Sequence, residues 1–473
     1  MAPSAVGNQA VVVGAGMSGL AAAAAVADYF DQVVVLERDT LPSDAAHRAG
    51  TPQSRHLHAL LAGGQRALGE LFPGFEEKLA RAGAVPLRVA VDVRMELPGF
   101  DPFPTRDLGW DVYSMSRPLI ERVVRECVQR RSNITLCQRY RVRDLVASAD
   151  GEAVTAVRYE NAVGNSETLH GDLIIDASGR GGLTLGFLEA IGQPQPEETL
   201  IGVDIGYATA IFTIPDDAPS EWKGVLTLSQ APESSRGALM MPLEGGRQWL
   251  ATLGGRYGEK PPGDGDGFVS FAQHLPTPTL YNAIRHAKRR GDIARFSFPA
   301  SVWRHFEGLE AFPHGLLPFG DSICRFNPVW GQGMSVAAQE AVLLRRLLGS
   351  GDASPLARLA SAFFAEAAAL IETPWASAAV PDLAFPQTEG QRPADLDRML
   401  KFGDALMRLA AEDPAIHKLT VEVRHLLKPR SVLRDPGLVE RVQAIMGWNV
   451  ISIVGRVGRG PPPCGLDAPA MRV

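Results

Sequence analysis

The sequence predicts an α/β protein that combines a Rossmann-like βαβ unit with a mainly antiparallel second sheet and a helical C-terminal segment. The first indication is an apolar strand followed by spaced glycines and an alanine-rich stretch, "AVVVGAGMSGLAAAAAVA". The second is a series of strand-like runs separated by proline and glycine turns, such as "GYATAIFTI" and "QWLATLGG". The third is a helical pattern from about residue 354 onward, as in "SPLARLASAFFAEAAALI".

Composition and charge describe an ordinary globular protein. Its 473 residues are 45% hydrophobic and 21% charged, which is enough chain for several well-buried cores. A net charge of −6 without a long basic run argues against nucleic acid as the main partner. The cysteines are scattered without a CxxC pair, which fits a reducing cytoplasm and neither a disulfide framework nor a zinc site. They are Cys127, Cys137, Cys324 and Cys464.

The uncharged stretch 10–27 is the one segment that raises the question of a membrane span. It consists mostly of alanine and glycine rather than leucine, it follows no basic segment, and a glycine turn interrupts it. We therefore expect no transmembrane segment here.

The same stretch carries a nucleotide-binding pattern. Val11–Val13 form a buried strand, and Gly14, Gly16 and Gly19 then give GxGxxG at the start of a helix. The helix N-terminus supplies free N–H groups for phosphates. A second strand, residues 33–36, ends in Glu37, 18 residues past Gly19 and close to the spacing expected for the acid that binds a ribose. This predicts a dinucleotide site but does not distinguish FAD from NAD.

A stretch near residue 320, "GLLPFGDSICRFNPVWGQGM", favours FAD. Asp321 follows a predicted strand (316–319), where its carboxylate can accept hydrogen bonds from ribityl hydroxyls. Pro328 fixes the backbone before Gly331 and Gly333, which let the chain pass close to a flat ring. The helix that starts near Met334 would then direct its N-terminus toward a reduced, anionic flavin.

With these two motifs the sequence resembles the para-hydroxybenzoate-hydroxylase-like flavin monooxygenases. The resemblance implies an FAD-binding domain whose cofactor contacts come from both motifs and from three arginines. The implied contacts are Gly14, Gly16, Gly19, Glu37, Arg38, Arg55, Arg117, Asp321, Pro328, Gly331, Gly333 and Met334.

Three further stretches narrow the likeness to polyketide epoxidases of the lasalocid and monensin type, and more distantly to squalene epoxidase. They are "GTPQSRHLHALLAGG", "SMSRPLIERVVRECV" and "LIIDASGRGG". The resemblance implies an FAD-dependent monooxygenase that inserts one oxygen atom from O2 through a flavin C4a-hydroperoxide. Its expected substrate is an alkene of a hydrophobic polyketide or terpenoid. Aromatic hydroxylation and, in another class, flavin-dependent reduction of isoprenoid double bonds remain open, as does a non-catalytic flavoprotein.

The electron source is also open. Aromatic hydroxylases of this fold carry an Asp-Gly motif with a downstream arginine that serves FAD and NADPH. The matching stretch here is "DASGRG", residues 176–181. NAD(P)H could therefore act directly or through a separate flavin reductase as a partner.

The pattern along the chain predicts a discontinuous architecture. Residues 8–85, 112–200 and 300–350 are expected to form the FAD-binding domain, and 86–111 and 201–299 the substrate domain. Residues 351–460 are expected to be helical and 461–473 a disordered tail.

Candidate pocket residues are aromatic or apolar. We expect substrate contacts from Met240, Trp249, Trp303, Phe326 and Trp330. His56 and His58 lack a nearby third ligand, so we expect packed histidines and no metal site. The sequence offers no convincing general base, which favours epoxidation because the cofactor performs that chemistry, whereas phenol hydroxylation gains from a base.

Overall fold

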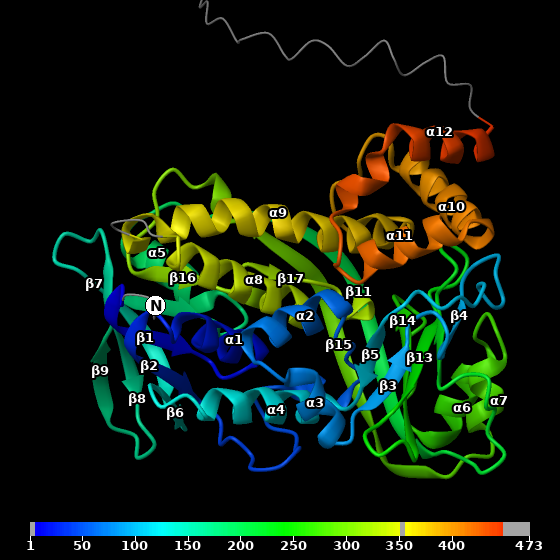
Figure 1. The fold of residues 1–473 in the computed structure, drawn as a ribbon, viewed down its shortest axis with the longest axis horizontal. Helices are drawn as coiled ribbons and strands as arrows, with labels where there is room; N and C mark the ends of the chain where they lie inside the picture. The colour runs from blue at the N-terminus through cyan, green and yellow to red at the C-terminus, as the bar shows by residue number, and fades with distance from the viewer. Residues whose placement is uncertain (1–4, 351–354, 448–473) are drawn as a thin grey trace, which may run out of the picture.

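The computed structural model describes residues 5–350 and 355–447, and Figure 1 shows two large sheets toward opposite ends of the molecule. The first is a parallel sheet in the order β16-β10-β1-β2-β6. Its strands are β1 (Gly7–Val13), β2 (Phe30–Glu37), β6 (Ile134–Gln138), β10 (Leu173–Asp176) and β16 (Leu316–Pro318). The predicted strand–glycine–helix–strand unit is thereby confirmed.

Helices cover one face of this sheet, and they share one core with it. They are α1 (Met17–Val26), α2 (Ala62–Leu71), α3 (Phe75–Arg81), α4 (Arg117–Gln129) and α8 (Gly333–Leu348). The alanines of α1 are almost completely buried. Because these side chains are small, α4 and α8 both pack directly against this helix.

A small antiparallel meander covers the other face of the parallel sheet. It consists of β7 (Arg141–Ala147), β8 (Val154–Glu160) and β9 (Ser166–His170), and α5 (Gly182–Ala190) lies beside it. Val11 and Val13 pack against Val157 in a separate apolar cluster. Helices on one face and the meander on the other bury both faces of the sheet, as an all-parallel sheet requires.

The second large sheet has the order β17-β15-β11-β14-β13-β12-β4. Its strands are β4 (Val93–Glu96), β11 (Glu197–Thr213), β12 (Gly224–Thr227), β13 (Gly237–Pro242), β14 (Gln248–Arg256), β15 (Arg289–His305) and β17 (Cys324–Arg325). All neighbours are antiparallel except β12 and β4. This confirms the expected mainly antiparallel sheet.

Two short helices, α6 (Gly265–Gln273) and α7 (Thr279–Ile284), cover the outer face of the second sheet. A two-stranded ribbon of β3 (Val85–Arg88) and β5 (Asp111–Ser114) leads from α3 to α4. The boundaries expected near residues 200 and 300 fall inside β11 and β15. These 17-residue strands cross from one part of the molecule to the other.

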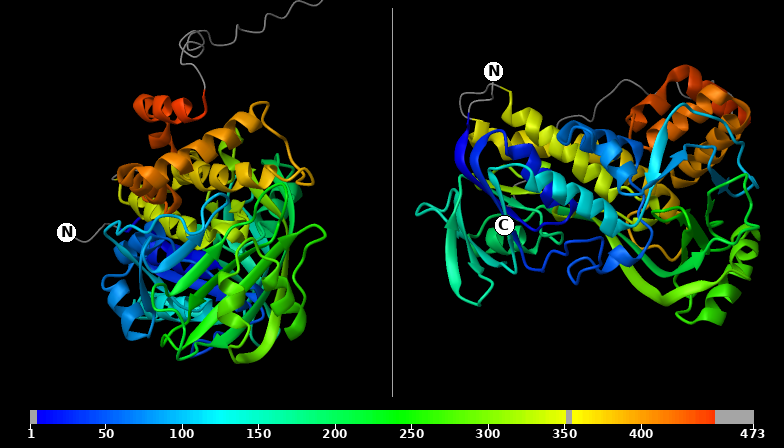
Figure 2. Two further views of the ribbon diagram at one scale, coloured as in Figure 1. Left: turned by 90° about the vertical axis from the view of Figure 1, so that its right-hand side faces the viewer. Right: turned by 60° about the horizontal axis from the view of Figure 1, so that its bottom comes forward.

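Residues 355–447 are mainly helical, as the sequence predicts; the rest of the expected helical segment, residues 351–354 and 448–460, lies outside the described residues. The described part forms α9 (Pro355–Leu383), α10 (Leu396–Glu412), α11 (Pro414–Arg424) and α12 (Pro436–Ile445). In Figures 1 and 2, α9 runs along α8, and the last three helices lie at the end of the molecule that holds the antiparallel sheet. The tail expected at 461–473, with Cys464, lies outside the described residues.

Within the described ranges, each helix is too short or too polar to cross a lipid bilayer. The uncharged stretch 10–27 forms β1, the glycine turn and α1 instead.

Candidate functional site

The three glycines after β1 each meet a different surrounding. Gly14 has a φ of +101°, and a Cβ there would lie 2.7 Å from the carbonyl oxygen of Ala177. A Cβ on Gly19 would lie 1.9 Å from the carbonyl oxygen of Gly14, so only glycine lets α1 approach the turn. Gly16 has no heavy atom within 4 Å of its ideal Cβ position. The first and third glycines therefore shape the turn, and the second leaves backbone open to a ligand.

The N-terminus of α1 is suited to an anion. Gly16 is its N-cap and provides no side-chain cap, and the first turn holds no acidic residue. Backbone N–H groups at this end lack intrahelical acceptors and carry partial positive charge. The turn and helix end thus fit the pyrophosphate of a dinucleotide.

Glu37 ends β2 beside this turn and is 4% exposed. Its Oε2 accepts the backbone N–H of Ala15 (2.8 Å), and its Oε1 accepts that of Asp39 (2.9 Å). A carboxylate oxygen can accept two bonds; Arg48 is the second partner of Oε2, whereas Oε1 can accept a further bond. Glu37 is therefore held where a ribose hydroxyl could donate to it.

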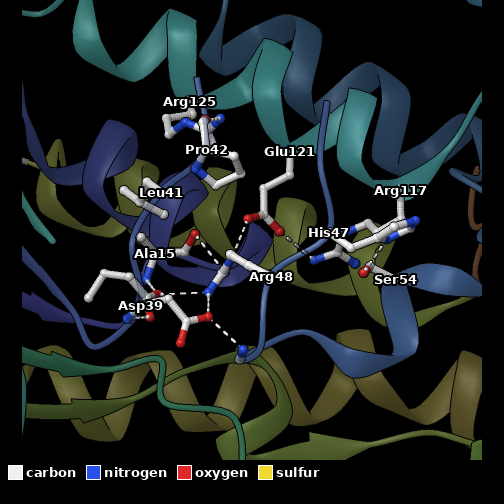
Figure 3. A network of polar contacts seen from close by, with 12 residues as sticks. Ala15, Asp39, Leu41, Pro42, His47, Arg48, Ser54, Arg117, Glu121 and Arg125 are labelled. Atoms are coloured by element: carbon white, nitrogen blue, oxygen red, sulfur yellow. Dashed lines mark hydrogen bonds and ion pairs between the residues drawn. The ribbon is translucent and has the colours of Figure 1, made fainter. Parts of the chain in front are cut away.

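Arg48 is the centre of a buried charge network that the sequence did not reveal (Figure 3). Its Nη1 lies 2.9 Å from Asp39 Oδ2 and 3.3 Å from Glu37 Oε2. Its Nε lies 2.7 Å from Glu121 Oε1. Burial lowers the pKa of Arg48, but Glu121 and Glu37 outweigh that effect and the pKa is raised overall. One guanidinium thus fixes the loop after β2 against α4.

The face of α4 that meets this network carries Arg117, Glu121 and Arg125 at four-residue intervals, and all three are buried (Figure 3). Arg117 Nη2 lies 3.5 Å from Glu121 Oε2. Arg117 Nε has no hydrogen-bond partner among the described residues, and burial lowers the pKa of this side chain. A buried guanidinium with an unused donor fits contact with a polar cofactor.

The other two predicted arginines are placed differently. Arg38 directly follows Glu37, and Arg55 ends the short helix η1 (Pro52–Arg55); both are exposed. Each lies near the cofactor motif in the chain, but neither is buried with Arg117.

The turn after β16 presents Asp321. It lies in η3 (Gly320–Ser322), where Gly320 has a φ of +63° and donates its N–H to Glu340 Oε2 on α8 (2.8 Å). A Cβ on Gly333 would lie 3.7 Å from Asp321 Oδ1, so the two motif residues are neighbours. Burial raises the pKa of Asp321 to about 6, opposed by Arg325 and Arg117.

The glycine-rich end of the same motif forms a second open helix N-terminus. Pro328 begins η4 (Pro328–Trp330), and Gly331 follows with a φ of +63°. Gln332 is the N-cap of α8 and provides no side-chain cap. Gly333 and Met334 are the first residues of that helix.

Several buried polar atoms around this turn have no hydrogen-bond partner within the described residues. Besides Arg117 Nε they are Ser322 Oγ, Trp330 Nε1 and Gln332 Oε1. Native proteins leave few such groups unpaired, so their presence together indicates a polar ligand. A flavin, with ring acceptors, a ring N–H and ribityl hydroxyls, fits this donor and acceptor set.

The stretch 176–181 packs against the first glycine turn. Asp176 is completely buried and accepts bonds from the hydroxyl groups of Ser178 (2.6 Å) and Thr184 (2.7 Å). Its carboxylate is thus engaged by its own loop and by the first turn of α5. The carbonyl of Ala177 faces Gly14, so this loop borders the dinucleotide turn.

The two histidines lie between the cofactor turn and the antiparallel sheet. His56 is buried, and its Nδ1 lies 2.7 Å from Thr209 Oγ1 on β11. Burial lowers the pKa of His56 to about 4 and that of His58 to about 3. Both rings are neutral at pH 7.

The predicted pocket residues fall into two groups. Trp303 and Phe326 both contact Trp375 of α9, with ring centroids 5.6 Å and 6.5 Å apart, and Trp330 lies on η4. Met240 and Trp249 instead lie in the core between the sheet and helices α6 and α7, where Trp249 stacks on Trp222. The structure therefore does not bring Met240 and Trp249 together with the turn before α8. Successive side chains of a strand point to opposite faces, and Met240 on β13 and Trp249 on β14 both lie on the outer face.

A cavity of about 290 Å³ lies elsewhere, at the start of β16 beside η2 (Phe306–Gly308) and α9. None of the predicted cofactor or pocket residues lines it.

Comparison with known proteins places the chain among flavin enzymes. The model of the FAD dependent oxidoreductase family matches residues 9–186. "Protein Rv3254" of Mycobacterium tuberculosis is 33% identical over 394 residues, which cover 80% of this chain and 81% of that protein.

Solved structures share the fold at much lower identity. The flavin-dependent brominase Bmp2 superposes with a TM-score of 0.65 at 13% identity, covering 93% of this chain and 98% of its own. PqsL, a probable FAD-dependent monooxygenase from Pseudomonas aeruginosa, gives 0.54 at 14% identity, covering 80% and 98%.

Proposed function

Because the chain belongs to the FAD-dependent oxidoreductase family, we propose that it is a monooxygenase that transfers one oxygen atom from O2 to an alkene. The proposed substrate is a hydrophobic polyketide or terpenoid. The observation that carries the proposal is the combination of an aromatic cluster with two neutral histidines, His56 and His58, beside the turn before α8.

Trp303, Phe326 and Trp375 form an aromatic cluster in the core, and Trp375 shares a second apolar cluster with Val329 of η4. We propose that this cluster forms the apolar side of the substrate site. His56 and His58 belong to the segment whose Ala59 faces Gly331, and their lowered pKa values make them weak bases. Hydroxylation of a phenol gains from a base that deprotonates the ring hydroxyl, whereas epoxidation does not need one. The site therefore favours epoxidation over aromatic hydroxylation.

The chain's own residues would bind the FAD cofactor and orient it. The turn Gly14–Gly19 and the N-terminus of α1 would hold the pyrophosphate, Glu37 a ribose, and Asp321 the ribityl chain. The N-terminus of α8, with Gly331 and Gly333, would lie against the ring and favour its anionic reduced form. Arg38, Arg55, Arg117, Pro328 and Met334 complete the proposed contacts.

When bound, FAD supplies the redox chemistry between NAD(P)H and O2. Ser178 and Thr184 each donate a backbone N–H and a hydroxyl group to Asp176, so both of its oxygens already accept two bonds and offer none to a nicotinamide cofactor. We therefore favour reduction by a separate flavin reductase over direct reduction.

The fold alone also admits halogenation, because the brominase Bmp2 shares it. The sequence lacks the Trp-x-Trp-x-Ile-Pro stretch of flavin-dependent halogenases. We therefore favour oxygen transfer.

The test has three steps. The purified protein is denatured and its released cofactor is identified by absorbance and mass. The holoprotein is then mixed anaerobically with NADPH, NADH, or NADH plus a flavin reductase, and the loss of oxidised-flavin absorbance is followed. Finally, ¹⁸O₂ is admitted in the presence of apolar polyenes or phenols, and the products are analysed by mass spectrometry.

We expect the released cofactor to be FAD and its reduction to require the added reductase. We also expect one ¹⁸O atom in the polyene product. Labelled phenol products alone would identify a hydroxylase, and a saturated, unlabelled product would identify a reductase. Absence of bound and bindable FAD would overturn the proposal. Asp321→Asn is expected to lower product formation, and Asp217→Asn, an exposed carboxylate, serves as the matched control.

A further inference from the structure

Asn327 and Asp382 form a completely buried pair at the cofactor turn, although they lie 55 positions apart in the chain. The Asn327 Nδ2 group donates to both carboxylate oxygens of Asp382, at 3.1 Å and 3.0 Å. Asn327 directly precedes η4, and Asp382 lies near the end of α9. The C-terminal helical segment thus reaches the loop proposed to hold the flavin ring.

The carboxylate determines which way the Asn327 amide points. An ionised carboxylate only accepts hydrogen bonds, so it must face the NH2 group of the amide. The amide oxygen Oδ1 is thereby turned toward the backbone N–H of Val329 (3.1 Å) and the hydroxyl of Tyr207 (3.4 Å). That oxygen caps η4, the turn that ends at Gly331.

Arg256 balances the buried charge. Its Nη2 lies 2.5 Å from Asp382 Oδ1, its side chain is 5% exposed, and its guanidinium lies 5.0 Å from the ring centroid of Phe385. Burial raises the pKa of Asp382, while Arg256 and Asn327 oppose that effect. The charged or titratable groups that face the pair are Arg256 from β14 and Tyr207 from β11.

We propose that Asp382 is a positioning residue for the cofactor: it orients Asn327, whose carbonyl fixes the turn 328–331 and the start of α8 against the flavin ring. This inference rests on the proposed role of that turn in FAD binding. A pair of apolar side chains could fill the same volume, but it could not select one orientation of the turn.

The decisive experiment exchanges the two side chains. Asn327→Asp places two carboxylates face to face, and Asp382→Asn forces the new amide to choose between Asn327 and Arg256. In the double variant N327D/D382N, the amide at position 382 can donate to the carboxylate at 327 and accept from Arg256. The acceptor at 327 for the Val329 N–H is also kept.

Binding of FAD to each apoprotein is measured by quenching of flavin fluorescence, and the bound cofactor is examined by visible circular dichroism. Each single variant is expected to weaken FAD binding about 10- to 100-fold, as loss of a hydrogen bond to a charged group does. The exchange is expected to restore affinity to within about threefold and to restore the circular dichroism bands.

A pH series adds a readout that general destabilisation does not produce. In N327D, one carboxylate can hold a proton and donate to the other at low pH, and repulsion grows as both ionise. FAD affinity of this variant should therefore fall between pH 6 and 8 relative to the unchanged protein. Asp204→Asn, which removes the exposed ion pair between Asp204 of β11 and Lys260 of the loop after β14, should leave FAD affinity unchanged.

If the single variants fail to fold, Asn327→Ser provides the test, because serine can still cap the turn but cannot reach Asp382 in the same way. FAD affinity and circular dichroism that stay unchanged in the folded variants would overturn the inference while leaving the proposed function intact. Failure of the unchanged protein to bind FAD would overturn both.

Discussion

A Cβ atom on Gly19 would lie 1.9 Å from the carbonyl oxygen of Gly14, so the first turn of α1 is packed directly on the glycine turn that precedes it. No side chain can be added there unless α1 moves away from β1. The contact explains why the third glycine of the motif is a packing requirement, whereas the open surroundings of the second leave room for a ligand.

Gly19→Ala is therefore expected to destabilise the protein even without cofactor, and to do so more than Gly16→Ala. The ideal Cβ position of Gly16 is open, so alanine there should cost at most about 1 kcal/mol through its poorer N-cap preference. It should nevertheless weaken FAD binding, because the added methyl group occupies the approach to the pyrophosphate. Urea unfolding of the two apoproteins, followed by FAD titration, checks both. Equal stability of the two variants would contradict the packing argument.

Removal of the central guanidinium of Figure 3 should be costly. Arg48→Met leaves Glu37, Asp39 and Glu121 without their shared partner, and breaking a buried ion pair in this way costs about 3–5 kcal/mol. The free energy of unfolding of the apoprotein measures this loss.

The exposed Arg55 gives a matched arginine control. Arg55→Met should change the free energy of unfolding by less than about 0.5 kcal/mol. If it also lowers FAD affinity, the predicted contact of Arg55 with the cofactor is supported; a stability loss equal to that of Arg48→Met would contradict the exposed position of Arg55.

Glu340 gives the apoprotein a distinctive pH dependence. Burial raises its pKa to about 8, the Gly320 N–H opposes the shift, and Asp321 adds to it. Between its ordinary value of 4.5 and this raised value, the folded state holds a proton that the unfolded state has released. Stability is therefore fully present at low pH and falls as pH rises, by about 1.4 kcal/mol per pH unit for one such group.

Glu340→Gln removes this contribution and keeps an acceptor for Gly320. The stability difference between the variant and the unchanged protein should therefore move in favour of the variant as pH rises from 5 to 8. Urea unfolding at four pH values measures it. A difference that does not vary with pH would show that Glu340 ionises normally in the folded protein.

Substitutions of Trp249 and Trp330 should have opposite effects on stability and on the spectrum of bound flavin. Trp249→Ala removes a core side chain between β14 and α6 and should cost about 3–5 kcal/mol, with the flavin spectrum unchanged. Trp330→Phe, on the partly exposed turn η4, should cost little stability but alter the visible circular dichroism of bound flavin. A change in the flavin spectrum caused by Trp249→Ala would instead support the predicted place of Trp249 in the substrate pocket.

The sequence predicted those features that depend on local pattern. The βαβ unit follows from consecutive residues, and the position of Asp321 after a strand follows from one short motif. Arg48 and Asn327 were missed because their partners, Glu121 and Asp382, come from distant helices and are brought near only by the fold. One signal was available: Arg117, Glu121 and Arg125 recur every four residues on an otherwise apolar helix face, a spacing that places charges together on the buried side.

Met240 and Trp249 illustrate a different limit. Strand alternation shows that a residue points to one face of a sheet, but both faces of this sheet are covered, one by α6 and α7. Apolar composition therefore could not tell the substrate side from the outer side.

The discontinuous parallel sheet has a consequence for synthesis of the protein on the ribosome. The strands that surround the glycine turn after β1 are complete at Asp176. The elements β16 and α8, which supply the sheet edge and the proposed second cofactor turn, end at Leu348, about 170 residues later. At roughly 5 to 20 residues per second, that interval is roughly 10 to 30 s. During this time the nascent chain would carry a dinucleotide turn without a place for the flavin ring, and the alanine surface of α1 would remain uncovered by α8. We therefore expect the proposed cofactor to be captured late in synthesis, and the nascent N-terminal part to need protection from aggregation until then.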